Sequence, residues 1–166
     1  MTTATADITV RALDDDWADV RRIYAEGIAT RSATFETSVP PRHALRRKWL
    51  VGHRWVAEAG GAVVGWAAIS RVSSRACYAG VGETSIYVAA AFQGQGVGKA
   101  LLRKQVRAAD EDGLWTLQTS IFPENAASMA LHRAAGFRIV GVRERIAQLD
   151  GRWRDTILLE RRSVAR

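Results

Sequence analysis

Residues 80–102, GVGETSIYVAAAFQGQGVGKALL, constrain the fold of this chain more than any other stretch. The first third alternates β-branched and aromatic residues with smaller ones as far as Val88, which predicts a strand. The last third predicts a helix, because apolar residues recur at helical spacing from Ala100 onward. The middle contains three glycines within five positions, namely Gly94, Gly96 and Gly98. The stretch therefore predicts a strand, a glycine loop and a helix in direct succession.

A glycine loop that opens a helix can bind phosphate groups. The first N–H groups of a helix have no partner within it, and the helix dipole adds partial positive charge there. Glycine lets a ligand approach this backbone closely. The P-loop is excluded because Gly98-Lys99 is followed by Ala100 instead of Ser or Thr, and the spacing GxGxxG of dinucleotide-binding loops is absent. A purely structural strand–helix turn stays open as the alternative.

The size and composition of the chain favour one folded domain, expected over residues 7–162. The 166 residues are 48% hydrophobic and 25% charged, which is ordinary for a globular protein. No apolar run approaches the ~20 residues that span a bilayer, so no membrane partner is expected. Residues 1–6 lack the features of a secretory signal and are expected to form a loose tail. The single cysteine, Cys77, excludes an internal disulfide framework and fits a cytoplasmic location.

The formal net charge of +7 fits an anionic ligand but has more than one explanation. A basic balance can serve nucleic acid, an acidic membrane or an anionic small molecule. The basic residues lie in short, separate clusters such as Arg21-Arg22 and Arg161-Arg162. This pattern argues against a nucleic-acid partner and leaves a solvated basic surface as the simplest explanation for most of them.

Periodicity along the chain predicts the order β, two helices, β, β, β, helix, β, helix, β, β. The first two helices are expected at 17–29 and from Pro40-Pro41 through Leu50. The polar segment 30–39 between them is either a substrate lip or a simple connector. Asp150-Gly151 predicts a hairpin turn between the last two strands. The other strands are expected at 7–12, 54–59, 62–70, 114–121, 137–149 and 153–160, and the last helix at 123–135.

The glycine loop resembles a loop of known function. Gln93, Gly96 and Gly98 form the pattern Q-x-x-G-x-G, which resembles the acyl-coenzyme A pyrophosphate loop of the GCN5-related N-acetyltransferases (GNAT). The predicted order of elements matches that family over about residues 8 to 162. Three stretches are similar to its phosphinothricin and methionine sulfoximine N-acetyltransferase branch, namely those within 83–88, 121–137 and 142–161.

This resemblance implies both a fold and a function. The fold is of the α/β (α+β) class, with a mixed, mostly antiparallel sheet flanked by helices and with splayed central strands. The function is direct transfer of an acetyl group from acetyl-CoA, without a metal, to a small amino acid analogue such as phosphinothricin, methionine sulfoximine or methionine sulfone. A homodimer is also implied. Another acceptor amine and a non-catalytic acyl-CoA sensor stay open as alternatives, and detoxification and self-resistance would use identical chemistry.

The resemblance places acetyl-CoA along the central strand, the glycine loop and two helix starts. A backbone N–H near Tyr87 or Val88 is expected to stabilise negative charge on the reacting carbonyl oxygen. Asn125 could equally be a helix cap, and Lys99 and Arg103 could belong to a solvated helix face. The expected cofactor contacts are Ile86, Tyr87, Val88, Gln93, Gly94, Gln95, Gly96, Val97, Gly98, Lys99, Asn125 and Ser128.

Two residues are candidates for proton transfer. Glu83 precedes the glycine loop on the central strand, and a carboxylate there can take a proton from the acceptor ammonium, directly or through water. His132 occupies a position where the branch carries histidine, and imidazole can act as proton donor or polar orienter near neutral pH. Each has a structural alternative: Glu83 could pair with an arginine, and His132 could be a hydrogen-bonded core residue.

The acceptor residues follow from the chemistry of an amino acid analogue. Arginine matches a carboxylate bidentately. Gly80 and Gly82 are expected to loosen the strand edge and enlarge the pocket. An acetyl-cysteine intermediate on Cys77 is disfavoured, because no histidine lies beside it in the sequence. The expected substrate contacts are Phe35, Thr37, Arg71, Arg75, Tyr78 and Glu83, with Glu36 beside them, although each could be ordinary surface.

Overall fold

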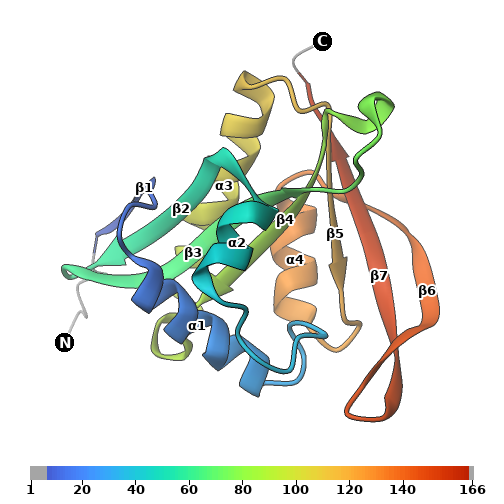
Figure 1. The fold of residues 1–166 in the computed structure, drawn as a ribbon, viewed down its shortest axis with the longest axis horizontal. Coiled ribbons are helices and arrows are strands. Elements are labelled where there is room, and N and C mark those ends of the chain that lie inside the picture. Colours follow the sequence, from blue (N-terminus) through green and yellow to red (C-terminus); the bar gives the residue numbers. More distant parts are fainter. Residues whose placement is uncertain (1–6, 165–166) are drawn as a thin grey trace.

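The computed structural model of the chain describes residues 7–164, so the tail expected at 1–6 lies outside the described residues. Seven strands form one sheet in the order β1-β2-β3-β4-β5-β7-β6. Figure 1 shows α1 and α2 on one face of this sheet and α3 and α4 on the other. Every neighbouring pair of strands is antiparallel except β4 and β5. The fold is therefore the mixed, mostly antiparallel sheet flanked by helices that the family resemblance implies.

The elements follow the predicted order throughout the described residues. Two short 3-10 turns, η1 (Ala76–Tyr78) and η2 (Ala90–Phe92), flank the central strand. The strands and helices are β1 (Ile8–Ala12), α1 (Trp17–Ala29), α2 (Arg42–Lys48), β2 (Trp49–Ala59), β3 (Ala62–Arg71), β4 (Val81–Val88), α3 (Val97–Glu111), β5 (Thr116–Ile121), α4 (Ala126–Ala134), β6 (Arg138–Leu149) and β7 (Arg152–Arg162).

The largest difference from the prediction is the boundary between α2 and β2. The helix was expected through Leu50 and the strand from Arg54, but α2 ends at Lys48 and β2 begins at Trp49. Trp49 pairs with Ser70 across the sheet, and a bulge absorbs the irregular stretch before Arg54. The Trp49 ring is buried, with its centroid 4.8 Å from that of Trp66. Tertiary packing of this indole therefore overrides the helical spacing.

The last helix also begins later than expected. It starts at Ala126 instead of Pro123, because Asn125 is its N-cap and accepts a hydrogen bond from the Ser128 N–H at 3.2 Å. The predicted hairpin turn at Asp150-Gly151 is confirmed, and both residues have positive φ, of 50° and 76°. Such angles suit the two-residue turn that joins β6 to β7.

Two apolar layers hold the sheet between its helices. On one face, α1 and α2 cover a cluster that contains Trp17, Ile23 and Trp66. On the other face, α3 and α4 cover a cluster that contains Leu101 and Leu117. None of the helices within residues 7–164 combines the length and apolarity needed to cross a membrane.

The central strands β4 and β5 separate after a short contact. They pair only from Val81–Thr116 to Glu83–Gln118, although β4 continues to Val88 and β5 to Ile121. Figure 1 shows the two strands diverging below this contact, with α4 alongside the gap. The splayed central strands implied by the resemblance are therefore present. The separation leaves backbone groups of β4 without a partner strand.

The glycines before Glu83 have a different role from the one expected. A Cβ at Gly80 would lie 2.0 Å from the Trp115 ring, and one at Gly82 would lie 2.5 Å from the Ile69 side chain. Neither glycine lines the cavity that contains Glu83. The expectation that they enlarge the pocket is wrong, because the space that a side chain would need is filled by the Trp115 ring at Gly80 and by the buried Ile69 side chain at Gly82.

We expect Gly82→Ala to lower the free energy of unfolding by about 1–3 kcal/mol, because the new methyl group overpacks the buried Ile69 side chain. Urea denaturation measures this loss. Gly141→Ala is the matched control in β6, where an added Cβ would meet no atom within 4 Å. Its free energy of unfolding should change by no more than about 0.5 kcal/mol. Equal stability of the two variants would contradict the packing argument.

Candidate active site

Two cavities meet where β4 separates from β5. The first, which we call the strand cavity, has a volume of about 250 Å³ and contains Glu83. The second, which we call the loop groove, has a volume of about 680 Å³ and follows the glycine loop to α4. The residues that line both are Ala33, Ile86, Tyr87, Asn125, Ser128 and His132. A ligand in the loop groove can therefore present one end to a second ligand in the strand cavity.

The glycine loop leaves backbone N–H groups open to the loop groove. Gly96 is the N-cap of α3 with a φ of 88°, and Gly94 has a φ of 74°. The first intrahelical bond comes from the Ala100 N–H, so the preceding N–H groups have no partner in the helix. A Cβ at Gly94 would meet no atom within 4 Å. This combination of positive φ, open space and free N–H groups fits a phosphate-bearing ligand.

Most of the expected cofactor residues line this groove. Gln95 is an exception, since its side-chain amide donates a hydrogen bond to the Ala91 carbonyl at 3.2 Å and the residue does not line the groove. The structure brings together Ile86, Tyr87, Val88, Gln93, Gly94, Gly96, Val97, Gly98, Lys99, Asn125 and Ser128.

Strand alternation decides which backbone groups of β4 face the gap. The Ala89 N–H bonds to the Val64 carbonyl of β3 at 2.8 Å, and the pairing of Tyr87 with Trp66 continues that register. Because successive residues point their backbone groups to opposite sides, Tyr87 faces β3 while Ile86 and Val88 face the gap. Val88, and not Tyr87, therefore offers a free N–H to the loop groove.

Glu83 is half-buried in the wall of the strand cavity, at the last residue pair that joins β4 to β5. The Gln118 side-chain amide of β5 donates a hydrogen bond to its Oε2 at 3.2 Å. No ion pair with Glu83 is present among residues 7–164, so the alternative of an arginine partner is not supported. The second carboxylate oxygen can accept a proton or a hydrogen bond from a ligand.

His132 is buried on α4 at the junction of the two cavities. Its Nδ1 lies 2.8 Å from the Ser128 carbonyl oxygen, which can accept a hydrogen bond only if Nδ1 carries a proton. Burial lowers the pKa of His132, opposed by the hydrogen bond to Ser128. The ring is therefore neutral at pH 7, with Nε2 as an acceptor. This state fits a polar orienter and not the proton donor that was the other expectation.

The segment at 30–36, which we call the strap, crosses the junction of the cavities. The Asn125 side chain donates to the Ser32 carbonyl at 3.4 Å, so this residue caps α4 and also holds the strap. The Arg154 guanidinium donates to the Arg31 carbonyl at 3.0 Å. Phe35 packs edge-on against Phe122, with 4.9 Å between ring centroids. Of the two possibilities for segment 30–39, these contacts favour a lip over a simple connector.

The acceptor side differs most from the sequence-based expectation. Phe35 and Glu83 line the strand cavity, but Thr37, Arg71, Arg75 and Tyr78 do not. Arg75 stacks over the Tyr78 ring at 5.5 Å, and Cys77 in the same turn is exposed. The polar lining residues that sequence reasoning missed are Tyr24, Thr34, Lys48, Thr84, Ser85, Thr119, Ser120 and Thr156, and the apolar ones are Ala33, Ile121 and Phe122.

Some of the missed residues carry a signal that sequence can provide. Thr119 is buried and shares one face of β5 with the core residues Leu117 and Ile121, so its strand position predicts an enclosed hydroxyl. Lys48 carries no such signal, because it is the end of a basic run that otherwise faces solvent. No group of three or more His, Cys, Asp or Glu side chains that could hold a metal occurs within residues 7–164.

Comparisons with known proteins agree with this geometry. The sequence profile of the Acetyltransferase (GNAT) family matches residues 16–137. The chain belongs to the GNAT acetyltransferase family. As a member of this family it is an acetyl-CoA-dependent N-acetyltransferase.

Relatives with named activities show which members of the GNAT family this chain resembles. It is 35% identical to a phosphinothricin N-acetyltransferase of Alcaligenes faecalis, over 92% of this chain and 81% of that protein. It is 34% identical to an L-methionine sulfoximine/L-methionine sulfone acetyltransferase of Pseudomonas paraeruginosa, over 87% of this chain and 88% of that protein. A crystal structure of a GNAT superfamily phosphinothricin acetyltransferase of Sinorhizobium meliloti in complex with AcCoA superposes with a TM-score of 0.86 and 32% identity, covering 96% of this chain and 91% of that one.

The neutral state of His132 in this GNAT site predicts a pH effect on stability. The folded state holds the pKa of His132 below its ordinary value of 6.5, so the unfolded chain binds a proton first as the pH falls. Stability is therefore lost as the pH drops through the unfolded pKa. We expect the free energy of unfolding of the wild type to fall relative to that of His132→Gln when the pH is lowered from about 7.5 to about 5.5.

Urea denaturation of both proteins at the two pH values measures this difference. The comparison removes the contribution of His53, whose pKa is also lowered by burial. A stability difference between wild type and His132→Gln that is independent of pH would show that His132 is not held neutral by the fold.

Proposed function

We propose that this N-acetyltransferase acetylates the α-amino group of a small amino acid analogue, such as methionine sulfoximine, methionine sulfone or phosphinothricin. The observation that carries the proposal is the junction of the two cavities, where His132 and the backbone of β4 lie between the loop groove and a small polar cavity with Glu83. A cavity of about 250 Å³ suits an amino acid better than a folded protein or an aminoglycoside. The named activities of the relatives support the same acceptors.

The loop groove is the site that we assign to acetyl-CoA. The free N–H groups at the start of α3 would hold the pyrophosphate, with Lys99 adding positive charge at the same helix end. The backbone groups of Ile86 and Val88 on the gap side of β4 would bond the amide-bearing arm. Acetyl-CoA supplies an activated thioester, whose carbon–sulfur bond breaks as the nitrogen–carbon bond of the product forms.

Three groups of the chain would act on the reacting atoms. The free carboxylate oxygen of Glu83 accepts the proton that the acceptor ammonium loses. The Val88 N–H donates to the carbonyl oxygen as negative charge develops on it. The Nε2 of His132 accepts a hydrogen bond from the amine and orients it. The leaving thiolate needs no strong acid, because an ordinary thiol has a pKa of about 8.5.

Direct transfer is supported over a covalent intermediate. Cys77 lies in the exposed η1 turn and lines neither the strand cavity nor the loop groove. The two substrates would instead meet across the junction, which is the arrangement that a ternary complex requires.

An acceptor panel tests the proposed reaction. We expect thiol release from acetyl-CoA with methionine sulfone, methionine sulfoximine or phosphinothricin, and little with spermidine, an aminoglycoside or a short peptide. Glu83→Gln should reduce kcat by about 10²- to 10⁴-fold while acetyl-CoA still binds, because a general base contributes on that order.

The control for Glu83→Gln is Glu111→Gln, which removes an exposed carboxylate that pairs with Arg107 at the far end of α3. Its kcat should equal that of the wild type. Turnover confined to another amine would reject the proposed acceptor. Binding of acetyl-CoA without turnover of any amine would support the sensor alternative.

We also propose that two copies of the chain form a homodimer through β6. This strand is the edge of the sheet and exposes Ile139, Val140, Val142 and Ile146, with Trp153 of β7 beside them. Exposed apolar side chains on an unpaired edge strand are typical of an association surface.

Val142→Asp is expected to shift the molar mass measured by light scattering from two chains to one, because it places a charge in this apolar face. Val51→Asp is the control, since Val51 is also exposed but lies in the irregular part of β2. A wild-type protein with the mass of one chain would contradict the proposed dimer.

A further inference from the structure

Acidic side chains outnumber basic ones in the lining of the strand cavity. Glu36 and Glu83 line it, and Lys48 is the only lysine or arginine that does so within the described part of the chain. The arginines expected to bind an acidic acceptor, Arg71 and Arg75, do not line it. The cavity therefore offers two carboxylates and one ammonium to whatever enters.

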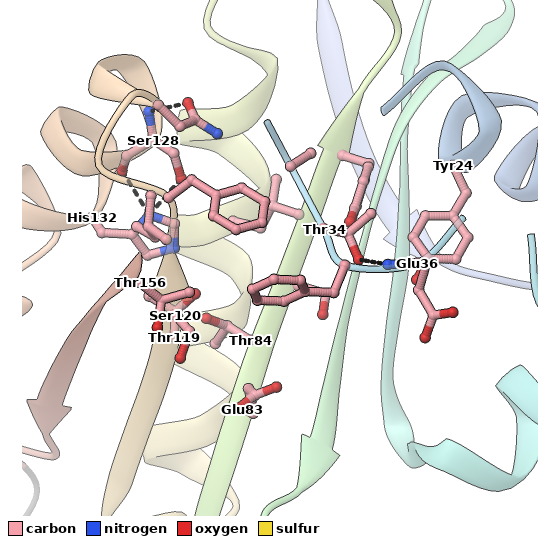
Figure 2. Close-up of a pocket in the computed structure, with 18 of the residues that line it drawn as sticks. Tyr24, Thr34, Glu36, Glu83, Thr84, Thr119, Ser120, Ser128, His132 and Thr156 are labelled. Atoms are coloured by element: carbon pink, nitrogen blue, oxygen red, sulfur yellow. Dashed lines mark hydrogen bonds between the residues drawn. The ribbon is translucent and has the colours of Figure 1, made fainter. Parts of the chain in front are cut away.

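Glu36 ends the strap and lines the strand cavity with an exposed side chain. Its backbone N–H donates to the Thr34 hydroxyl at 3.1 Å, which closes a local turn at the end of the strap. Figure 2 shows the Glu36 side chain beside Tyr24, with Glu83 on β4 and His132 on α4 at other sides of the same cavity. Burial, and then the negative charge of Glu36, raise the pKa of Tyr24 to about 12. The carboxylate charge is thus felt at a buried wall of the cavity.

Neutral hydroxyl groups form much of the remaining wall. Thr119 and Thr156 are 6% and 5% exposed, and their hydroxyls form no hydrogen bond with another residue between 7 and 164. Figure 2 places both beside His132 and Ser120, on the side of the cavity opposite Glu36. Both residues line the strand cavity, and hydroxyls there without a protein partner are expected to bond to a ligand or to water. They can donate to a neutral oxygen acceptor without requiring a negative charge.

The candidate acceptors differ in the charge that this cavity must accommodate. Methionine sulfone and methionine sulfoximine carry one ammonium, one carboxylate and a neutral polar group. Phosphinothricin carries a phosphinate in place of that neutral group, and so a second negative charge. One lysine can compensate one anion, and the second anion would lie in a cavity that already contains the Glu36 carboxylate. Like charges repel, so the Glu36 carboxylate would disfavour that second anion.

We propose that Glu36 is a specificity-determining residue, which selects zwitterionic acceptors with a neutral polar side chain and disfavours acceptors with a second anionic group. Lys48 compensates the α-carboxylate, and the hydroxyls of Thr119 and Thr156 serve neutral polar atoms of the acceptor. The inference rests on the proposed function, since it concerns the acceptor of the same reaction. It adds a preference within the proposed acceptors that neither the fold nor the relatives decide.

The test is the ratio of kcat/KM for methionine sulfone to kcat/KM for phosphinothricin. We expect the ratio to exceed about tenfold in the wild type, to fall about fivefold in Glu36→Gln and to fall about 25-fold in Glu36→Lys, as one and two units of charge are changed. Glu111→Gln, which lies in the lining of neither cavity, should leave the ratio unchanged. Thermal melting of each variant checks that it is folded, and raising the salt concentration should reduce the wild-type ratio.

The outcomes separate this inference from the proposed function. Turnover of both analogues with equal efficiency by the wild type, or a ratio unchanged in both folded Glu36 variants, overturns the role of Glu36 and leaves the proposed function standing. Turnover of neither analogue by the wild type overturns both. A kcat/KM ratio that falls in Glu36→Gln and falls further in Glu36→Lys supports selection of the acceptor by charge.

Discussion

The separation of β4 from β5 after the pair formed by Glu83 and Gln118 is the constraint on which the rest of the site depends. In most sheets, the backbone N–H and C=O groups of a central strand form hydrogen bonds with the strands on both sides. Here the strands diverge, so the gap-side groups of Ile86 and Val88 are free to bond a ligand. The same divergence opens the space between β4 and α4 into which His132 projects. Binding and chemistry therefore share one structural cause.

The strap completes the site that the divergence opens. It connects α1 to the segment before α2, and it is held on its other side by Asn125 and Arg154 from the distant half of the chain. Ala33 of the strap lines both cavities. Glu36, at the end of the strap, lines the strand cavity but not the loop groove. One short segment thus borders both proposed substrate sites and contributes a carboxylate to the strand cavity.

The sequence predicts the parts of this protein that local rules determine. The glycine loop, the Asp150-Gly151 turn and the order of the elements follow from spacing and turn chemistry. The end of α2 was missed because Trp49 is placed by its contact with Trp66, a partner distant in sequence. Arg71 and Arg75 are close to Glu83 in sequence, but the η1 turn intervenes and neither arginine lines the cavity.

The charge of the cavity could not be obtained from the sequence for a related reason. A net charge of +7 suggests a site rich in cations, yet cavity charge depends on which few side chains converge from separate elements. Glu36 comes from the strap, Lys48 from the end of α2 and Glu83 from β4, and only the folded chain brings the three together. The basic residues, which outnumber the acidic ones, lie largely on the outside, where water screens them. In the proposed site, acceptor selection therefore depends on three convergent charges and on the neutral hydroxyls opposite them, and the overall charge of the protein has little bearing on it.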